Sequence, residues 1–517
     1  MLSQVAWRYF KKYNCMVAGA ESKWFDTTHL RSDLKGHSIR GGFSTIGGQI
    51  FSFLLSISST IIMARLLLPG DYGLVAMVTA VTGFVAIFND LGLSAAVIQK
   101  SNINQQQVSA VFWINVLISL GIAVLIAMLA PVLVNFYHEP RLQNITLVFA
   151  FSIFLSGLSL QHNALMKRQM QFKRLSLIQI GSTATSLIIG VLLAWQDFGY
   201  WAIIATMVLL PVFSSISLWI VCDWRPVMVL KADQVNSFLK FGAGMTGFDL
   251  VNYFSRNMDN VLIGKYAGPA ALGFYSKAYQ LLMLPIPQLR NPLNAVALPA
   301  LSSLNNAPDQ YRSFFKRYLF TLAFFCMPLV IFCGIFSEEL ILIILGKQWA
   351  PAAVVFKILA IASFIQPVAS TQGLVLITTG RSKRYFLIGL VNSIVVVIGF
   401  YIGVQWGMIG VAISYAVVMY VGFIPFLYFS LKDSPMNVGL FLKEILYPAI
   451  FALMAGTAMY FFKMQFVYLQ PILLCGFGFV VGGIAYLAPW FSHANSKKRI
   501  TQIVEMILSV KNKKLKK

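Results

Sequence analysis

A row of polar and charged residues interrupts the apolar stretch between residues 238 and 264 and has the composition of an anion-binding face. Its members recur at spacings that alternate between short steps of one, three and four residues: Asp249, Asn252, Arg256, Asp259 and Asn260. At about 100° per residue, these side chains share one face of a helix. Arginine can hold phosphate oxygens in a forked, charge-assisted arrangement, and the amides are suited to hydroxyl groups. The row therefore predicts a site for an anionic, hydroxyl-rich ligand, in which the two acids modulate the arginine.

A structural interpretation of the same row stands beside this one. Arg256 can be neutralised by Asp249 or Asp259 in a buried ion pair that orders the protein and touches no ligand. Charged groups inside a bilayer are costly and almost always face a protein interior or a wet cavity, so both interpretations bury the row. The sequence alone leaves this choice open.

Further polar residues lie in neighbouring apolar stretches and join the list of candidates for a shared cavity. Residues 43–67 present a serine-rich face, whose alternative role is close helix packing. Residues 270–304 carry two cations, and the prolines at 285, 287 and 292 interrupt helical hydrogen bonding there. The additional candidates for substrate binding are Gln49, Ser52, Ser56, Asp90, Lys277 and Arg290.

The elements that must position these residues are membrane-spanning helices. The chain is 58% hydrophobic and 11% charged, with a mean hydropathy of +0.75. Apolar runs of about 20 residues, the length needed to cross the hydrocarbon layer, recur along it. We expect an all-α integral membrane protein with about 14 transmembrane helices: 43–67, 73–98, 108–136, 142–166, 174–195, 199–222, 238–264, 270–304, 314–345, 351–378, 384–404, 408–431, 443–462 and 468–490.

The net charge of +23 raises the question of nucleic acid, and the distribution of the basic residues answers it. Most of them fall in alternate loops and in the tail, including "MKRQMQFKR" (166–174) and "GRSKRY" (380–385). Such an asymmetry follows the positive-inside rule, so no nucleic-acid partner is predicted and both termini are expected in the cytoplasm. The scattered cysteines and histidines have no metal-ligand spacing, and residues 1–36 do not read as a secretory signal peptide.

An internal repeat divides the chain into related halves. "IIMARLLLPGDYGLVA" (61–76) aligns with "VLIGKYAGPAALGFYS" (261–276), so that Pro69 meets Pro269 and Gly73 meets Gly273. An even number of predicted spans separates the two stretches, which makes the halves parallel and pseudo-symmetric. The predicted divisions are a cytoplasmic N-terminal extension (1–36), an N-lobe (37–222), a cytoplasmic linker (223–237), a C-lobe (238–431), an additional helix pair (432–491) and a basic cytoplasmic tail (492–517).

Two stretches resemble a known family. Residues 38–78 and, more specifically, "FGAGMTGFDLVNYFSRNMDNVLIGKYAGPAALGFYSKAYQL" (241–281) are similar to polysaccharide flippases of the colanic-acid-exporter type, in the multidrug/oligosaccharidyl-lipid/polysaccharide exporter superfamily. The resemblance implies two six-helix lobes in a V around a central cavity and a trailing helix pair. It also implies alternating-access transport of an undecaprenyl-pyrophosphate-linked oligosaccharide across the bacterial inner membrane. The extension of residues 1–36 departs from the family's pattern.

The resemblance and the residues together define the expected function. The partners are a lipid-linked oligosaccharide, membrane lipids and, by analogy with the family, polysaccharide polymerisation and export machinery. No cofactor is expected, and proton or sodium coupling is left open. A multidrug/cation antiporter of the same superfamily is the alternative, although the cations balance the acids among the candidates. A membrane enzyme such as a glycosyltransferase is the third class, and it is disfavoured because the loops offer no acidic or metal-binding site. The glycan and the oligomeric state are not readable from the sequence.

Overall fold

Every regular element that the structure describes is a helix. The computed structural model describes residues 24–25, 34–90, 92–100, 103–228 and 236–492, excepting the side chains of 34–46, 50, 86–87, 236–252 and 254–255. The chain packs as two compact units, residues 1–257 and 258–517, and each is described by itself. This division falls inside the span predicted to open the C-lobe, and the finer lobe boundaries given above stay a prediction.

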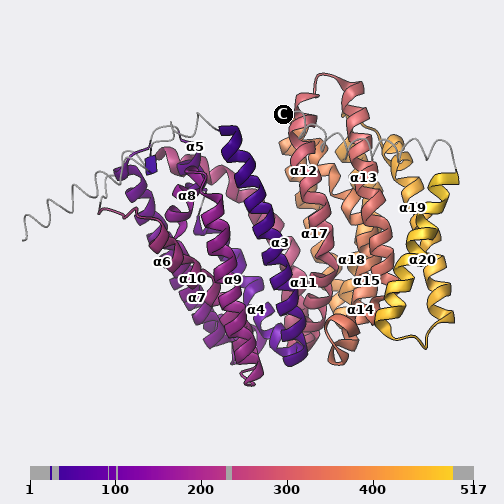
Figure 1. The fold of residues 1–517 in the computed structure, drawn as a ribbon, viewed down its shortest axis with the longest axis horizontal. Helices are drawn as coiled ribbons and strands as arrows, with labels where there is room; N and C mark the ends of the chain where they lie inside the picture. The colour runs from indigo at the N-terminus through magenta and orange to yellow at the C-terminus, as the bar shows by residue number, and fades with distance from the viewer. Residues whose placement is uncertain (1–23, 26–33, 91, 101–102, 229–235, 493–517) are drawn as a thin grey trace, which may run out of the picture. The chain divides into compact units, whose positions relative to one another are not determined.

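Unit 1 contains a set of long helices in which the second and fourth spans are interrupted (Figure 1). Helix α11 (Asn236–Met283) begins in this unit. The other elements are α3 (Leu34–Leu66), α4 (Pro69–Ala86), η1 (Ile87–Asn89), α5 (Leu93–Gln99), α6 (Gln105–Tyr137), α7 (Leu142–Gly157), α8 (Leu160–Arg168), α9 (Phe172–Trp195) and α10 (Tyr200–Val221).

Unit 2 repeats this order and adds a final pair of helices. After α11 come α12 (Pro285–Ser303), α13 (Pro308–Ile335), α14 (Ser337–Ile344), η3 (Lys347–Trp349), α15 (Ala350–Ala369), α16 (Thr371–Thr378), α17 (Ser382–Gly403), η4 (Val404–Trp406), α18 (Gly407–Leu431), α19 (Val438–Gln465) and α20 (Pro471–Ser492).

Length and composition support a multi-pass membrane protein. Within the described residues, ten stretches are long and apolar enough to cross a bilayer, and one of them, Ser382–Leu431, contains both α17 and α18. The predicted second, seventh and eighth spans are not among the ten. They correspond to the interrupted α4 and α5 and to the charged or proline-containing α11 and α12. The prediction of an all-helical membrane protein is confirmed, whereas the total of fourteen spans stays a prediction.

Small residues let the helices of unit 1 approach closely. A Cβ atom built on Gly157 of α7 would lie 2.0 Å from the Ser119 hydroxyl oxygen of α6. One built on Gly83 of α4 would lie 2.1 Å from the Tyr253 hydroxyl oxygen, and that hydroxyl donates a 2.9 Å hydrogen bond to the Thr79 carbonyl. Because membrane helices gain little from apolar burial against lipid, this close packing carries much of their association. The first part of α11 is thereby fixed to α4.

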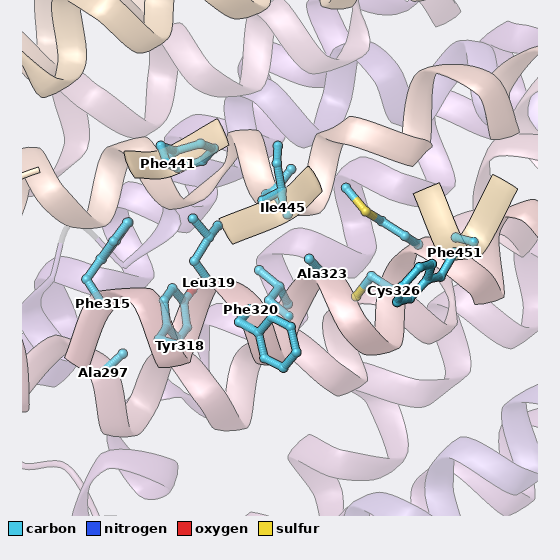
Figure 2. Close-up of a cluster of buried hydrophobic side chains, with 14 of the residues drawn as sticks. Ala297, Phe315, Tyr318, Leu319, Phe320, Ala323, Cys326, Phe441, Ile445 and Phe451 are labelled. Atoms are coloured by element: carbon cyan, nitrogen blue, oxygen red, sulfur yellow. The ribbon is translucent and has the colours of Figure 1, made fainter. Parts of the chain in front are cut away.

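Unit 2 is held by a large aromatic core between α13 and α19. Phe315 and Leu319 of α13 face Phe441 and Ile445 of α19 (Figure 2). The Phe320 ring instead packs against Trp490 of α20, with centroids 5.4 Å apart. The rings of Phe315 and Phe441 pack with centroids 6.3 Å apart. Aromatic pairs of this kind add about 0.5–1.5 kcal/mol beyond their buried area. This core joins the final helix pair to the rest of unit 2.

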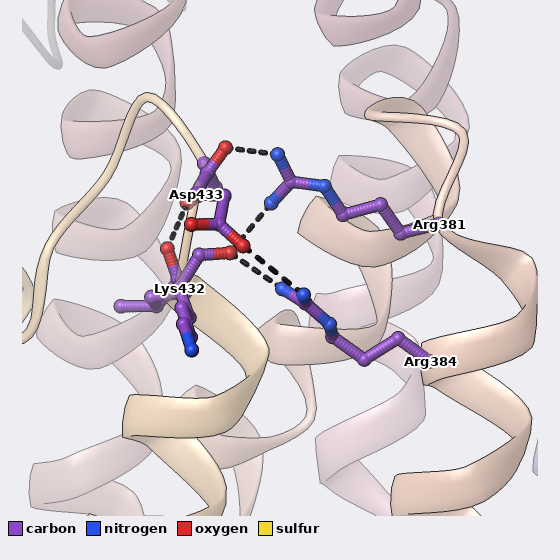
Figure 3. A network of polar contacts seen from close by, with 6 residues as sticks. Arg381, Arg384, Lys432 and Asp433 are labelled. Atoms are coloured by element: carbon purple, nitrogen blue, oxygen red, sulfur yellow. Dashed lines mark hydrogen bonds and ion pairs between the residues drawn. The ribbon is translucent and has the colours of Figure 1, made fainter.

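Two polar contacts also join the final pair to unit 2. Lys463 of α19 lies 2.8 Å from the Glu339 carboxylate of α14, with side chains 20% and 12% exposed. At the start of α17, Arg381 and Arg384 both donate to the backbone carbonyl of Lys432, in the connection from α18 to α19, at 2.6 and 2.7 Å. Arg384 also pairs with Asp433 of this connection (Figure 3). The forked guanidinium groups fix this loop.

Candidate substrate-binding site

The polar row predicted for the seventh span lies on α11, and its members differ in exposure. Arg256 is exposed, Asn260 is half-buried, and the Asp259 side chain is only 5% exposed. The side chains of Asp249 and Asn252 lie outside the described residues. The helical register of the row is as expected, since residues 236 to 267 form regular helix up to Gly268.

Asp259 is held by a tyrosine from the other side of a turn. The continuous run of α11 contains a non-helical residue, Gly268 (φ 83°, ψ 178°), followed by Pro269. A positive φ suits glycine, and proline suits the first turn of the next helix. Across this turn the Tyr275 hydroxyl donates a 2.9 Å hydrogen bond to one Asp259 oxygen, and the Asn260 N–H donates to the other at 2.8 Å. Asp259 therefore orders the turn between the seventh and eighth spans.

The two cations predicted for the eighth span lie on different helices. Lys277, at the end of α11, is half-buried and donates a 2.9 Å hydrogen bond to Gln280. Arg290 lies on α12, beyond the interruption at Pro285. Arg290 is half-buried, and its Nε atom is buried without a hydrogen-bond partner among the residues that the structure describes. A buried donor that is left unmet costs free energy, so an acceptor group on a ligand could satisfy this Nε–H.

An apolar pocket is lined in part by Leu289, the residue before Arg290 in the sequence. It encloses about 320 Å³, and Leu289 of α12 lies in its wall with residues of α13, α19 and α20. Met459 and Tyr486 contribute from α19 and α20, and the Tyr486 hydroxyl is already bonded to the Phe324 carbonyl at 2.9 Å. Its other lining residues are Phe324, Phe325, Pro328, Leu329, Phe332, Phe479, Gly482, Gly483 and Leu487. Unit 2 thus has a cation on α12 next in sequence to a residue that lines an apolar pocket.

The candidates in the first two spans lie in unit 1. Gln49 and Ser56 are exposed on α3, and Ser52 is half-buried with a hydroxyl that has no partner among the described residues. Asp90 follows η1, and its carboxylate accepts from the Ser94 N–H at 3.0 Å and the Ser94 hydroxyl at 2.6 Å. Asp90 therefore stabilises the start of α5, a structural role that its position before a helix favours.

Sequence reasoning missed three features of the region. Tyr275 was not linked to Asp259, although a tyrosine sixteen residues later on a helical hairpin is within reach. The apolar pocket was missed because lipid-facing and pocket-facing residues have the same composition. Asn294 of α12, which accepts a hydrogen bond from the Tyr318 hydroxyl, was likewise not proposed, although an asparagine within an apolar span is a signal of a buried polar contact.

Comparison with known proteins identifies the family of this chain. The model of the polysaccharide biosynthesis protein family matches residues 62–354. The chain is 26% identical over 378 residues to the teichuronic acid biosynthesis protein TuaB of Bacillus subtilis, covering 72% of this chain and 78% of that protein. It is 21% identical over 373 residues to the lipopolysaccharide biosynthesis protein WzxC of Escherichia coli, covering 70% and 75%.

Solved structures share the fold at low sequence identity. The lipid II flippase MurJ in its inward closed conformation superposes with a TM-score of 0.69 at 16% identity, over 86% of this chain and 99% of that one. An inward-facing multidrug transporter of the MATE family gives a TM-score of 0.57 at 13% identity, over 72% and 93%. Fold and sequence together confirm the resemblance: this chain belongs to the polysaccharide biosynthesis protein family, with the fold of the MurJ and MATE transporters of the MOP superfamily.

Proposed function

We propose that this protein is a flippase that carries an undecaprenyl-pyrophosphate-linked oligosaccharide across the bacterial inner membrane by alternating access, with both termini in the cytoplasm. The observation that carries the proposal is the half-buried Arg290 beside the apolar pocket of unit 2. A lipid-linked sugar has an anionic pyrophosphate joined to a long hydrocarbon chain. Arg290 matches the pyrophosphate, and the pocket matches the first part of the chain.

The relatives support the transport of a glycan. TuaB and WzxC are named for teichuronic acid and lipopolysaccharide biosynthesis. A third relative, ExoT of Rhizobium meliloti, is a succinoglycan biosynthesis transport protein, 24% identical over 343 residues. A transporter role accounts for the whole chain without catalysis. The alternative, a multidrug/cation antiporter, is less well supported, because the group beside the pocket is a cation and would repel a cationic drug.

The remaining candidates keep supporting roles in this proposal. Arg256 and Lys277 are further cations for the pyrophosphate, while Asn260, Gln49 and Ser56 offer hydrogen bonds to sugar hydroxyls. Asn252 and Asp249 stay candidates from the sequence. Asp259 and Asp90 act by holding the helices that carry the others. Coupling to protons or sodium, and association with polysaccharide polymerisation and export machinery, stay predictions.

Complementation of polysaccharide export tests the headgroup site. In a flippase-null bacterium whose export this chain restores, Arg290→Ala should reduce export about 10- to 100-fold, since a hydrogen bond to a charged group contributes about 1.5–3 kcal/mol. Arg290→Lys should retain part of the activity. The control is Arg141→Ala, which removes an arginine whose partner is Glu139, 2.8 Å away. Full export by Arg290→Ala at matched membrane expression would refute the site.

A pocket-filling pair of variants tests the hydrocarbon site. Gly483 lines the pocket, and a Cβ atom there would meet nothing within 4 Å, so Gly483→Leu fills the space without a clash. Gly476 lies on the same helix, is equally open and does not line the pocket. Gly483→Leu should lower export, and Gly476→Leu should not. Equal export by the two variants would exclude the pocket as part of the substrate site.

A further inference from the structure

Helices α5 and α8 of unit 1 form a small cap that is separated from the rest of their spans. Span 2 is interrupted between η1 and α5, where Gly92 has φ 71°, and span 4 is interrupted between Gly157 and Leu160. The two short helices pack against each other. The Arg168 guanidinium, at the end of α8, donates to the Val97 carbonyl near the end of α5 at 3.0 Å. The two helices of the cap are thus bonded to each other, and a break in the helix connects each of them to the rest of its span.

The surface on which the cap rests is poorly satisfied. Asn115 of α6 and Gln161 of α8 are fully buried, and neither amide group has a hydrogen-bond partner among the described residues. His162, the next residue of α8, lies against the Trp219 ring with centroids 4.5 Å apart. Buried amides without partners favour hydration, so this interface gains when the cap separates and water enters. The apolar cluster that joins the cap to α6 and α10 opposes this opening.

Trp24 of the N-terminal extension belongs to this cluster, and the partly buried Phe25 packs against it. The Trp24 side chain is 1% exposed, and the cluster includes Leu93 and Val97 of α5, Leu165 of α8 and Leu218 of α10. Gln169, which follows α8, donates a 2.9 Å hydrogen bond to the Trp24 carbonyl. The Trp24 indole N–H, however, has no partner among the residues that the structure describes. Burial of the large Trp24 ring favours binding to this cluster. The cost of its unmet N–H donor favours release.

We propose that Trp24 and Phe25 form a releasable latch that holds the α5–α8 cap closed, and that opening of the cap is a step of the transport cycle which this latch slows. The latch consists of these two residues, and it binds the apolar cluster formed by α5, α8 and α10. The effect of the latch on the transport rate rests on the proposed function. The binding of Trp24 to the cap does not depend on that function.

The chain contains a reporter for the latch. Cys222, directly after α10, belongs to the same cluster and is fully buried. Burial raises the pKa of its thiol to about 11, so the thiolate that reacts with maleimides is scarce while the cap is closed. Cys326 of unit 2 is also fully buried but lies in the separate core of α13. Labelling of Cys222 without labelling of Cys326 reports local opening rather than unfolding.

The test uses the full chain in lipid nanodiscs with a water-soluble maleimide, and mass spectrometry reads each cysteine. Trp24→Ala should label Cys222 about tenfold faster or more, since labelling follows the population of the open form. Trp24→Phe and Gln169→Ala should give smaller increases in the same direction. The matched control is Trp195→Ala, because Trp195 of α9 is 74% exposed. An unchanged rate at Cys222 in Trp24→Ala would overturn the latch.

Transport then tests the effect on rate. With a synthetic undecaprenyl-pyrophosphate-linked N-acetylglucosamine as probe, Trp24→Ala should flip faster than wild type in proteoliposomes. Faster labelling together with unchanged or slower flipping would overturn the place of the cap in the cycle. If wild type does not flip the probe, the same comparison is made by polysaccharide export in cells, so failure of this probe does not count as failure of the latch. If Cys326 labels as fast as Cys222, the cluster opens only by unfolding, and the latch is refuted.

Discussion

In unit 2, Gln372 near the start of α16 accepts a hydrogen bond from the Ser430 hydroxyl of α18 at 3.2 Å. In unit 1, Gln161 holds the same place in α8, 211 positions earlier, and at that offset Ser430 corresponds to Trp219. Gln161 is fully buried and has no partner among the described residues. The same glutamine, in the same place of two related units, is therefore satisfied in one and not in the other.

This difference indicates that unit 2 is the more rigid unit and unit 1 the one that opens more easily. Satisfied buried polar groups rigidify a core, whereas unsatisfied ones lower the cost of opening. Unit 2 combines its satisfied glutamine with the aromatic core, the Lys463–Glu339 pair and the pocket beside Arg290. It has the character of a fixed binding unit. Unit 1 has an interrupted second span, two buried amides without partners among the described residues, and the cap for which we propose a latch. We therefore expect unit 1 to be the more mobile of the two.

The largest expected effect comes from adding a side chain at the close contact between α6 and α7 of unit 1. We choose valine, because Val368 of unit 2 lies 211 positions after Gly157, the same separation as the two glutamines. Because a Cβ atom on Gly157 would lie 2.5 Å from the Ser119 Cβ, Gly157→Val should cost about 3 kcal/mol. Thermal unfolding in detergent measures this. Gly121→Val is the control, since a Cβ atom there meets nothing within 4 Å. Equal melting of both variants would contradict the close contact.

A smaller effect is expected at the turn of α11. Tyr275→Phe removes the hydroxyl that bonds to Asp259, and a hydrogen bond to a charged group contributes about 1.5–3 kcal/mol. Tyr266→Phe on the same helix is the control, because Tyr266 is 61% exposed. The free energy of unfolding, from denaturation in mixed micelles, should fall only for Tyr275→Phe. No difference between the two would mean that the hydrogen bond does not order the turn.

The two glutamines are compared directly by mutation, with a moderate expected change in stability. Gln372→Leu leaves the buried Ser430 hydroxyl without its partner and should destabilise the protein by about 1–2 kcal/mol. Gln161→Leu removes an amide that is already unmet and should be neutral or stabilising. Melting temperatures of the two variants, measured side by side, test this. Equal destabilisation by both would show that Gln161 has an unseen partner, and the contrast between the units would fail.

The smallest effect is a pH dependence at the loop before α7. The Arg141 side chain hydrogen-bonds to Glu139 and lowers the pKa of that carboxyl below its usual value. A lowered pKa in the folded state stabilises the protein above the ordinary pKa of glutamate, and this stabilisation is lost as the pH falls through the folded-state value. The pair is partly exposed, so we expect at most about 0.5 kcal/mol. Glu139→Gln and Arg141→Gln should each reduce, by the same amount, the fall of the melting temperature with decreasing pH below pH 5. If the two variants differ, the Glu139–Arg141 pair is not the source of this pH dependence.

The sequence predicted the features that depend on local pattern. Apolar runs predicted the helices. The repeat aligned Pro69 with Pro269, and in the structure each of these prolines begins a helical segment. The family resemblance at 241–281 was also correct. Features that depend on the angle between helices were not predictable. The Asp259–Tyr275 bond needs the turn at Gly268, and the pocket needs α20 to lie beside α13, which periodicity does not encode.

Direct binding of the lipid carrier tests the central claim that Arg290 and the adjacent pocket hold a polyprenyl pyrophosphate. Purified protein would be titrated with undecaprenyl pyrophosphate in nanodiscs, with native mass spectrometry as the readout, for wild type, Arg290→Ala, Gly483→Leu and the control Gly476→Leu. The account predicts weaker binding by the first two variants, about tenfold or more for Arg290→Ala, and unchanged binding by the control. Wild-type affinity in both Arg290→Ala and Gly483→Leu would contradict it.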